Sequence, residues 1–158
     1  MALKFRSTDR FLKPDAVFKS KLASKFIGSL MKRGKRSVAE RIFYDAMAII
    51  RERVEDKEPV QVFEQAVETI KPIIEVRSRR IGGMTYQVPC ELTTKRQTSL
   101  SIRWILDAAR SKKGRPMHLK LADELLDAYR KQGAAYEKRE NTHKMAEANR
   151  DFAHFAAR

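Results

Sequence analysis

The sequence predicts a mainly α fold: a six-helix, bundle-like domain with one protruding β-hairpin between the third and fourth helices. Two observations lead to this prediction. Through most of the 158 residues, apolar side chains recur at three- and four-residue steps, which is the period of an amphipathic helix. Only residues 73–90 alternate with a period of two, and Gly82-Gly83 in their middle is the signal of a two-residue turn that needs positive φ at both positions.

Apolar stripes place the first three helices at residues 18–32, 37–54 and 59–70. Gly34 is expected to end the first helix, because glycine adopts the left-handed cap conformation easily. Ser37 and Glu40 have the spacing of a capping box, so Ser37 is predicted to start the second helix. Pro59 is tolerated at a first helical position, and Pro72 stops the third helix.

The predicted hairpin carries arginines on its first strand. Side chains alternate between the two faces of a strand, so Arg77 and Arg79 are expected on one face together with Glu75. An isolated two-stranded ribbon is only marginally stable in water. The hairpin must therefore pack on helices or on a partner, and the arginines indicate an anionic partner.

Three more helices are predicted at residues 94–111, at 116–130, and from 134 to beyond Asn149. The first of these is apolar on nearly all sides and is expected to be the central helix. The polar side of this helix carries Arg96, Arg103 and Arg110. They are seven residues apart, about two helical turns, and therefore lie on one face.

The charge of the chain is strongly positive and unevenly placed. The 34 Lys and Arg against 20 Asp and Glu give a formal net charge of +14, and a charge of this size attracts polyanions. Residues 1–36 hold eleven basic and two acidic side chains, and residues 93–115 hold seven and one. Residues 37–70 hold four basic and eight acidic side chains, so this block is expected to face solvent or a protein neighbour.

The residues offer no pattern for an enzyme. Five residues separate Gly28 from Gly34-Lys35, and Arg36 follows the lysine. A phosphate-binding loop has four residues between its two glycines, and Ser or Thr directly after the lysine. Three scattered histidines and the single cysteine, Cys90, match no zinc motif and no nucleophile–base pattern. We expect no catalysis, no cofactor and no metal. One cysteine fits a reducing compartment, and the absence of a long apolar run predicts a soluble protein without a membrane partner.

Four basic clusters favour nucleic-acid binding: residues 1–16, 32–36, 77–80 and 95–115. Each lies at a loop, a helix end or the hairpin, where Lys and Arg reach phosphates and release counterions. Composition leaves two partners open, because a basic hairpin can wrap DNA, as architectural DNA-binding proteins do, or enter a folded RNA. A lipid-surface protein is the weaker alternative, because the apolar stripes are those of core-facing helices.

Four blocks along the chain also carry a family resemblance. They are Phe26 to Lys35 with Gly34-Lys35-Arg36-Ser37, the hairpin from Val76 to Pro89, Arg103-Trp104 with Ala108-Ala109-Arg110, and the run from Lys138 to His154. These blocks resemble the small ribosomal subunit protein seven family in its bacterial-type form, which organelles share. The resemblance implies a structural protein of the small ribosomal subunit that binds the 3′ major domain of 16S-type rRNA first and nucleates assembly of the head.

The resemblance also implies neighbours and sites. The exit-site tRNA and the mRNA path would lie nearby, with small-subunit ribosomal proteins nine and eleven, in the ribosomes of a bacterial cytoplasm or of an organelle. Residues 1–16 would be a flexible basic arm, and residues 17–155 a single helical rRNA-binding domain. The rRNA-binding residues would be Lys4, Arg6, Arg10, Lys35, Arg36, Arg77, Arg79, Lys95, Arg96, Arg103, Lys112, Lys113 and Arg115. The residues near tRNA or mRNA would be Arg80, Gly82, Gly83, Met84, Tyr86, Lys138, Arg139, His143, Lys144 and Asn149.

Overall fold

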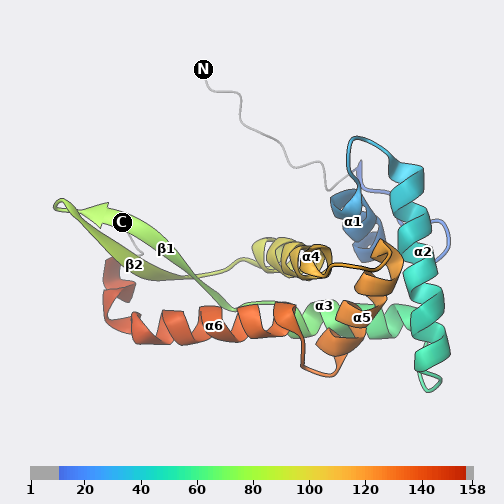
Figure 1. Ribbon diagram of the computed structural model, residues 1–158. Coiled ribbons are helices and arrows are strands. Elements are labelled where there is room, and N and C mark those ends of the chain that lie inside the picture. Colours follow the sequence, from blue (N-terminus) through green and yellow to red (C-terminus); the bar gives the residue numbers. More distant parts are fainter. Residues whose placement is uncertain (1–10, 156–158) are drawn as a thin grey trace.

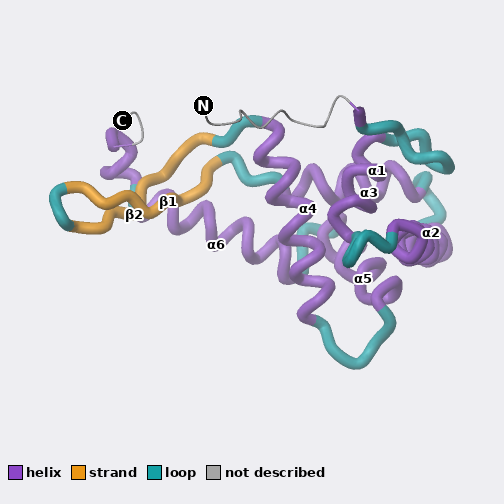
Figure 2. The backbone as a smooth tube through the Cα atoms, turned by 90° about the horizontal axis from the view of Figure 1, so that it is seen from above, coloured by secondary structure: helices purple, strands orange, loops and turns teal. Residues whose placement is uncertain are grey.

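The computed structural model describes residues 11–155 and confirms a mainly helical fold with one antiparallel hairpin between the third and fourth helices (Figure 1). The helices α1 to α5 form a body, and the hairpin extends away from that body alongside α6 (Figure 1, Figure 2). The elements are, in order, α1 (Lys21–Leu30), α2 (Arg36–Arg53), α3 (Pro59–Ile70), β1 (Ile74–Ile81), β2 (Met84–Glu91), α4 (Thr94–Ser111), α5 (Met117–Tyr129), α6 (Ala134–Ala148) and the 3-10 helix η2 (Arg150–Phe155).

Three phenylalanines from three helices form the centre of the body. Phe26 of α1, Phe43 of α2 and Phe63 of α3 are completely buried. The ring of Phe63 meets that of Phe26 at 5.2 Å between centroids and 88° between planes, and that of Phe43 at 5.3 Å and 82°. Each edge-to-face pair contributes about 0.5–1.5 kcal/mol beyond the area it buries. The cluster therefore fixes α1, α2 and α3 against one another, while α4 packs against α1, α3, α5 and α6 as its apolar sides predict.

A buried carboxylate joins the last three helices. Glu124 of α5 is completely buried, and its Oε1 accepts the backbone N–H of Ala135 in the first turn of α6 at 2.9 Å. Its Oε2 lies 2.8 Å from the Nζ of Lys112, the residue that follows α4. Burial alone would lower the pKa of Lys112, but the contacts with Glu124 and Asp127 raise it, so the ammonium stays charged. Gly133 completes the junction, because a Cβ there would lie 2.8 Å from the Cβ of Asp127.

The turn of the hairpin has the backbone that its two glycines predict. Ile81 pairs with Met84 across Gly82 and Gly83. The φ angles of these glycines are +57° and +86°, and a two-residue turn of the primed type needs positive φ at both positions.

The hairpin is supported by the C-terminal part of the chain. The ring of Tyr86 on β2 packs against Phe152 and Phe155 of η2, with centroids 5.2 Å and 5.5 Å away. Arg79 of β1 donates from Nη1 to the carbonyl oxygen of Phe155 at 2.9 Å. At the base of the hairpin, the N–H of Ile73 donates to Nε2 of His143 in α6 at 3.2 Å. The ribbon therefore packs on helices of its own chain.

α1 begins at Lys21, three residues later than the apolar stripe predicts, because Asp15 shapes the chain before it. The buried carboxylate of Asp15 accepts the N–H groups of Val17 and Phe18 through Oδ2, at 3.1 Å and 3.0 Å. Its Oδ1 accepts the hydroxyl of Tyr44 at 2.8 Å. Burial and this hydrogen bond raise the pKa of Tyr44 to about 12. The turn is thereby fixed to α2.

The prediction that Ser37 starts α2 is wrong. α2 begins at Arg36, and no side chain caps its start. Glu40 accepts a hydrogen bond from Nε of Arg36 at 2.8 Å, so it pairs one turn along the helix instead of completing a capping box. α1 ends at Leu30, and Gly34 lies in the turn between the two helices with a φ of +73°.

α6 is shorter than predicted. It ends at Ala148 and does not continue beyond Asn149, whose side-chain amide donates to the carbonyl oxygen of Met145 at 2.8 Å. The chain then turns into η2, which packs on β2. The apolar residues beyond Asn149 were predicted to extend a helix, but they contact the hairpin instead.

Replacing Glu124 tests the buried junction. Glu124→Ala removes the acceptor of the Ala135 N–H and the partner of Lys112, so we expect the free energy of unfolding to fall by about 2–3 kcal/mol. Glu124→Gln keeps the acceptor and should cost less. Urea unfolding followed by circular dichroism measures both, with Glu52→Gln on the exposed side of α2 as the control. A loss for Glu124→Ala no larger than that of the control would contradict the role given to this carboxylate.

Candidate nucleic-acid interface

The predicted rRNA-binding residues within residues 11–155 fall on four parts of the chain. Lys4, Arg6 and Arg10 lie outside the described residues. The others lie on β1 of the hairpin, in the α1–α2 loop and the start of α2, along α4, and in the loop between α4 and α5: Arg77 and Arg79; Lys35 and Arg36; Lys95, Arg96 and Arg103; Lys112, Lys113 and Arg115.

At the base of the hairpin, two arginines share one acidic side chain. Glu75 is only 8% exposed; its Oε1 contacts Nε of Arg77, and its Oε2 lies 3.2 Å from Nε of Arg96 in α4. Burial raises the pKa of Glu75, but the hydrogen bonds and charges of Arg77 and Arg96 outweigh it and lower the pKa below its usual value. Glu75 therefore ties the hairpin to α4, and the two guanidinium groups, about half exposed, still face solvent with one net positive charge.

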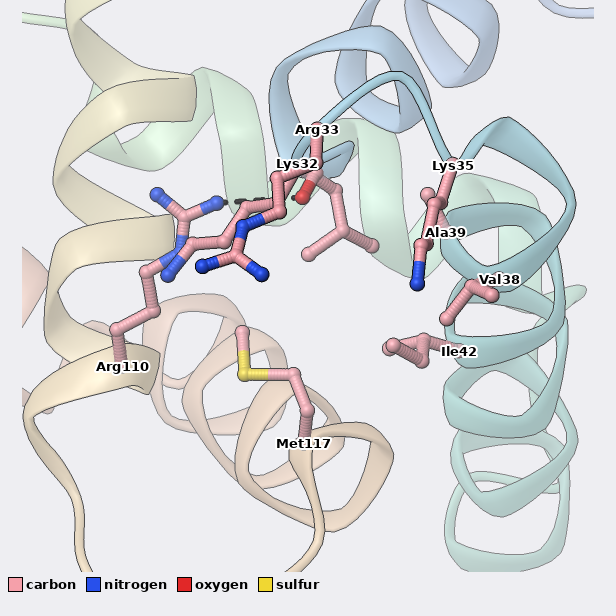
Figure 3. A pocket seen from close by; sticks show the side chains of 9 residues that line it. Lys32, Arg33, Lys35, Val38, Ala39, Ile42, Arg110 and Met117 are labelled. Atoms are coloured by element: carbon pink, nitrogen blue, oxygen red, sulfur yellow. Dashed lines mark hydrogen bonds between the residues drawn. The ribbon is translucent and has the colours of Figure 1, made fainter.

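The loop between α1 and α2 forms the rim of a hollow that α4 closes (Figure 3). Lys32, Arg33 and Lys35 come from the loop, and Arg110 comes from the last turn of α4. Lys32 and Arg33 point toward Arg110, and Lys35 points into the hollow from the other side (Figure 3). The volume of the hollow is about 350 Å³, and its floor is made of Leu30, Val38, Ala39, Ile42 and Met117.

The backbone of α1 holds Arg110 in place. Nη2 of Arg110 donates to the carbonyl oxygen of Leu30 at 3.2 Å, at the end of α1 where helical carbonyls lack partners. Among residues 11–155, the side chains of Lys32, Arg33 and Lys35 have no hydrogen-bond or ion-pair partner. The rim therefore carries four positive charges and no acidic side chain.

A second hollow, of about 460 Å³, lies between α1 and α4, and Arg110 lines both hollows. Its lining includes Lys25, Ser29, Arg103 and Asp107. The predicted residues Lys35 and Arg103 thus line two neighbouring hollows that share Arg110, and we refer to these two hollows together as the cationic groove. Sequence reasoning left Lys25, Lys32, Arg33 and Arg110 out of the candidate residues. The signal for Arg110 was its seven-residue spacing from Arg103, and the signal for Lys32 and Arg33 was their place in a basic loop.

In the loop between α4 and α5, two of the three predicted cations are paired. Lys112 contacts Glu124 and Asp127, and Nη1 of Arg115 lies 3.1 Å from Oδ2 of Asp123. Lys113 is exposed, and its side chain has no such partner among the described residues. Arg36, at the start of α2, is likewise paired with Glu40. The structure therefore gives Lys112 a role inside the fold and leaves Lys113 facing outward.

The residues predicted near tRNA or mRNA lie on the hairpin and on α6, which are side by side (Figure 2). Arg80, Gly82, Gly83 and Met84 are exposed at the tip, whereas Tyr86 is half-buried against η2. On α6, Lys138 and Lys144 are exposed, and Asn149 is half-buried at its end. The ammonium of Lys138 lies 5.8 Å from the centroid of the Trp104 ring, a cation–π distance. The guanidinium of Arg139 contacts Glu140 at 3.0 Å and lies 5.5 Å from the centroid of Tyr136.

His143 connects α6 to the hairpin as a neutral side chain. Its Nε2 accepts the N–H of Ile73, so this nitrogen must be unprotonated. Burial lowers the pKa of His143, the positive charge of Arg139 lowers it further, and Glu140 opposes the change. The position predicted to lie near tRNA therefore also joins two elements of the fold.

The fold and the site define a helical protein with a hairpin arm and a cationic groove suited to a polyanion. The family model described as ribosomal protein S7p/S5e matches residues 3–150, and the chain belongs to this family. Proteins named small ribosomal subunit protein uS7 are similar to it along most of their length. The one from Rhodopirellula baltica is 63% identical over 87% of this chain and 88% of the relative, and the one from Thermotoga maritima is 53% identical over 95% and 96%.

Within residues 11–155, none of the helices has both the length and the apolar character needed to cross a membrane.

The contact between His143 and Ile73 should weaken as the pH falls. Because the pKa of His143 is lowered in the folded protein, the unfolded chain takes up the proton first. The stabilisation is complete above the unfolded pKa of about 6.5 and is lost as the pH falls through the folded pKa. The difference in unfolding free energy between the wild type and His143→Ala, about 1 kcal/mol at pH 7.5, should therefore shrink by pH 5.5. Urea unfolding at both pH values measures it, and a constant difference would contradict the contact. Lys144→Ala is the control.

Proposed function

We propose that this chain is a structural protein of the small ribosomal subunit that binds the 3′ major domain of 16S-type rRNA and nucleates folding of the head. Family membership and the name shared by the relatives support the ribosomal role. The observation that supports RNA binding is the cationic groove, in which side chains from the α1–α2 loop and from α4 converge. Such a groove neutralises several phosphates at once and releases their counterions.

The distribution of charge along α2 also supports this proposal. The helix has 18 residues and is about 27 Å long at 1.5 Å per residue. The cationic loop lies at one end, and the exposed Glu55, Asp56 and Glu58 lie in the turn at the other end (Figure 1). Lys57 and Arg51 offset part of this acidic charge, so a polyanion is attracted more strongly to the α1–α4 face than to the α2–α3 turn.

The hairpin tip and α6 would approach the exit-site tRNA and the mRNA, with ribosomal proteins nine and eleven as neighbours. The exposed positions of Arg80, Met84 and Lys144 support contacts outside the body. The basic residues 1–10 would add rRNA contacts, and residues 17–155 would form the rRNA-binding domain, with the ribosome of a bacterium or of an organelle as its location.

Filter binding of the purified protein tests the proposal. We expect the protein to bind a transcript of the 3′ major domain more tightly than a transcript of the 5′ domain and a DNA duplex of equal length, at 150 mM salt. Equal affinity for all three would reduce the activity to unspecific binding of polyanions and overturn the rRNA assignment. Tighter binding of the duplex would favour an architectural DNA-binding protein.

Replacing two hairpin arginines tests their contact with phosphate. Arg77→Gln with Arg79→Gln should weaken rRNA binding and make the slope of log K against log salt less steep by about 2, one unit for each lost phosphate contact. The matched control, Arg41→Gln with Arg51→Gln, removes the same charge from exposed positions of α2. An unchanged slope for the hairpin pair, or an equal change for the control, would contradict the role of this strand.

Truncating the tip should separate tRNA contacts from rRNA binding. Met84 is 64% exposed and Arg80 is exposed, so Arg80→Ala with Met84→Ala leaves the core intact. Surface substitutions usually change folding stability by no more than about 0.5 kcal/mol, so the fold should be intact. Because the tip lies away from the proposed rRNA contacts, we expect the rRNA affinity to stay close to that of the wild type. Retention of exit-site tRNA on reconstituted subunits should fall. Val17→Ala, also exposed, is the control. Normal tRNA retention would show that the tip has no such contact.

A further inference from the structure

The hollow between the α1–α2 loop and α4 combines two kinds of surface (Figure 3). Its floor is apolar, from Leu30, Val38, Ile42 and Met117, and its rim is cationic, from Lys32, Arg33, Lys35 and Arg110. A site for phosphate alone does not need an apolar floor. A site for an apolar peptide does not need four cations, since positive side chains without partners gain nothing from apolar neighbours.

A nucleotide has both properties, because its base offers flat apolar faces and its phosphates are anionic. Sequence-specific RNA recognition takes place mostly at single-stranded loops and bulges, where a base leaves the stack and contacts side chains. The volume of about 350 Å³ falls at the lower end of the range for small-molecule sites, about 300–1,000 Å³.

Val38 exposes apolar surface at the floor of the hollow, where Ile42 and Met117 are only partly covered by the core. Val38 is 50% exposed, although it lies in the first turns of α2 beside the buried Ala39. Met117, at the start of α5, is half-buried, and its thioether is a flexible, polarizable group suited to contact with a flat ring.

The rim is organised before a ligand arrives. Arg110 is held by the carbonyl oxygen of Leu30, so its planar guanidinium has a fixed position at the edge of the floor. Arg33 and Gly34 both have positive φ, at +53° and +73°, so the loop turns sharply and brings Lys32 and Lys35 to opposite sides of the hollow (Figure 3). The start of α2 has no side-chain cap and no acidic residue in its first turn, and a phosphate is the natural partner of such a helix end.

We propose that this hollow holds one unstacked nucleotide of the RNA, with the base against Val38, Ile42 and Met117 and the flanking phosphates at Lys32, Lys35 and Arg110. The inference rests on the proposed RNA-binding function and deepens it. It assigns to this loop a contact with a base, whereas charge alone predicts contacts with phosphates only.

The test compares substitutions of apolar and of cationic residues by the salt dependence of rRNA binding that each variant shows. Val38→Gln keeps the net charge, does not lower the helix propensity, and removes the apolar contact. We expect it to lower rRNA affinity about tenfold, the loss of one buried apolar side chain, with the slope of log K against log salt unchanged. Lys35→Gln should make the slope less steep by about 1. Val17→Gln, at another exposed valine, is the matched control and should bind as the wild type does.

Val38→Thr guards against a folding defect, because it keeps the branched shape and replaces only one methyl group with a hydroxyl. Urea unfolding of each variant shows whether the fold is intact, and we expect Val38→Thr to lower the affinity in the same direction by a smaller factor.

An abasic scan of the RNA identifies the base. Removing the base at one nucleotide should weaken wild-type binding, and Val38→Gln should then have no further effect on that RNA. The inference is overturned if folded Val38→Gln binds rRNA like the wild type, or if its lower affinity relative to the wild type persists with every abasic RNA. It is also overturned if, in subunit reconstitution, the only defect of this variant is failure to bind a neighbouring protein. Failure of the proposed function looks different, because the wild type itself would then show no preference for the 3′ major domain.

Discussion

The position of α6 depends on the buried carboxylate of Glu124. A carboxylate at this depth is costly unless its oxygens find partners. Here Oε1 accepts a hydrogen bond from the N–H of Ala135 in the first turn of α6, and Oε2 forms an ion pair with Lys112 at the end of α4. The carboxylate on α5 therefore joins α4, α5 and α6. β1 packs on α6, and β2 packs on η2 beyond it, so the direction in which the hairpin leaves the body follows from this junction. The hairpin, which would be only marginally stable alone, thus owes its orientation to the buried carboxylate of Glu124 on α5.

The acidic residues divide the cations of the chain into two groups. The first group forms ion pairs: Arg53 and Arg115 with Asp123, Lys112 with Glu124 and Asp127, and Arg36 with Glu40. These cations stabilise helix ends and loops. The loop residues Lys32, Arg33 and Lys35 have no such partners in the described part of the chain, and they share one face with Arg103 and Arg110. Positive charge is thus neutralised where it supports the fold and left open along the groove, which is the distribution that binding of a polyanion requires.

Periodicity predicted the helical class, the third helix and the hairpin turn, because each of these depends on neighbours in sequence. It failed where a distant side chain decides the local backbone. Asp15 is fixed by Tyr44, 29 residues away, and the turn that results delays α1. The alternation along β1 put Glu75 on one face with Arg77, but it could not show that Arg96 of α4 would join them and that the carboxylate would be buried. The capping box failed for a local reason: Glu40 pairs with Arg36, four residues before it in the sequence, and no side chain caps the start of α2.

The hairpin and the C-terminal residues form one unit, although the sequence presents them as two. Tyr86 packs between Phe152 and Phe155, Arg79 binds the carbonyl oxygen of Phe155, and His143 holds the base of the ribbon. A partner that displaces η2 therefore removes support from β2, and a partner that bends the hairpin disturbs η2. Arg79 belongs both to the arginine-bearing strand and to this contact, so binding of phosphate at that strand and packing of the C-terminal residues act on the same guanidinium. The strand that we propose binds rRNA is thus physically linked to the C-terminal residues through that side chain.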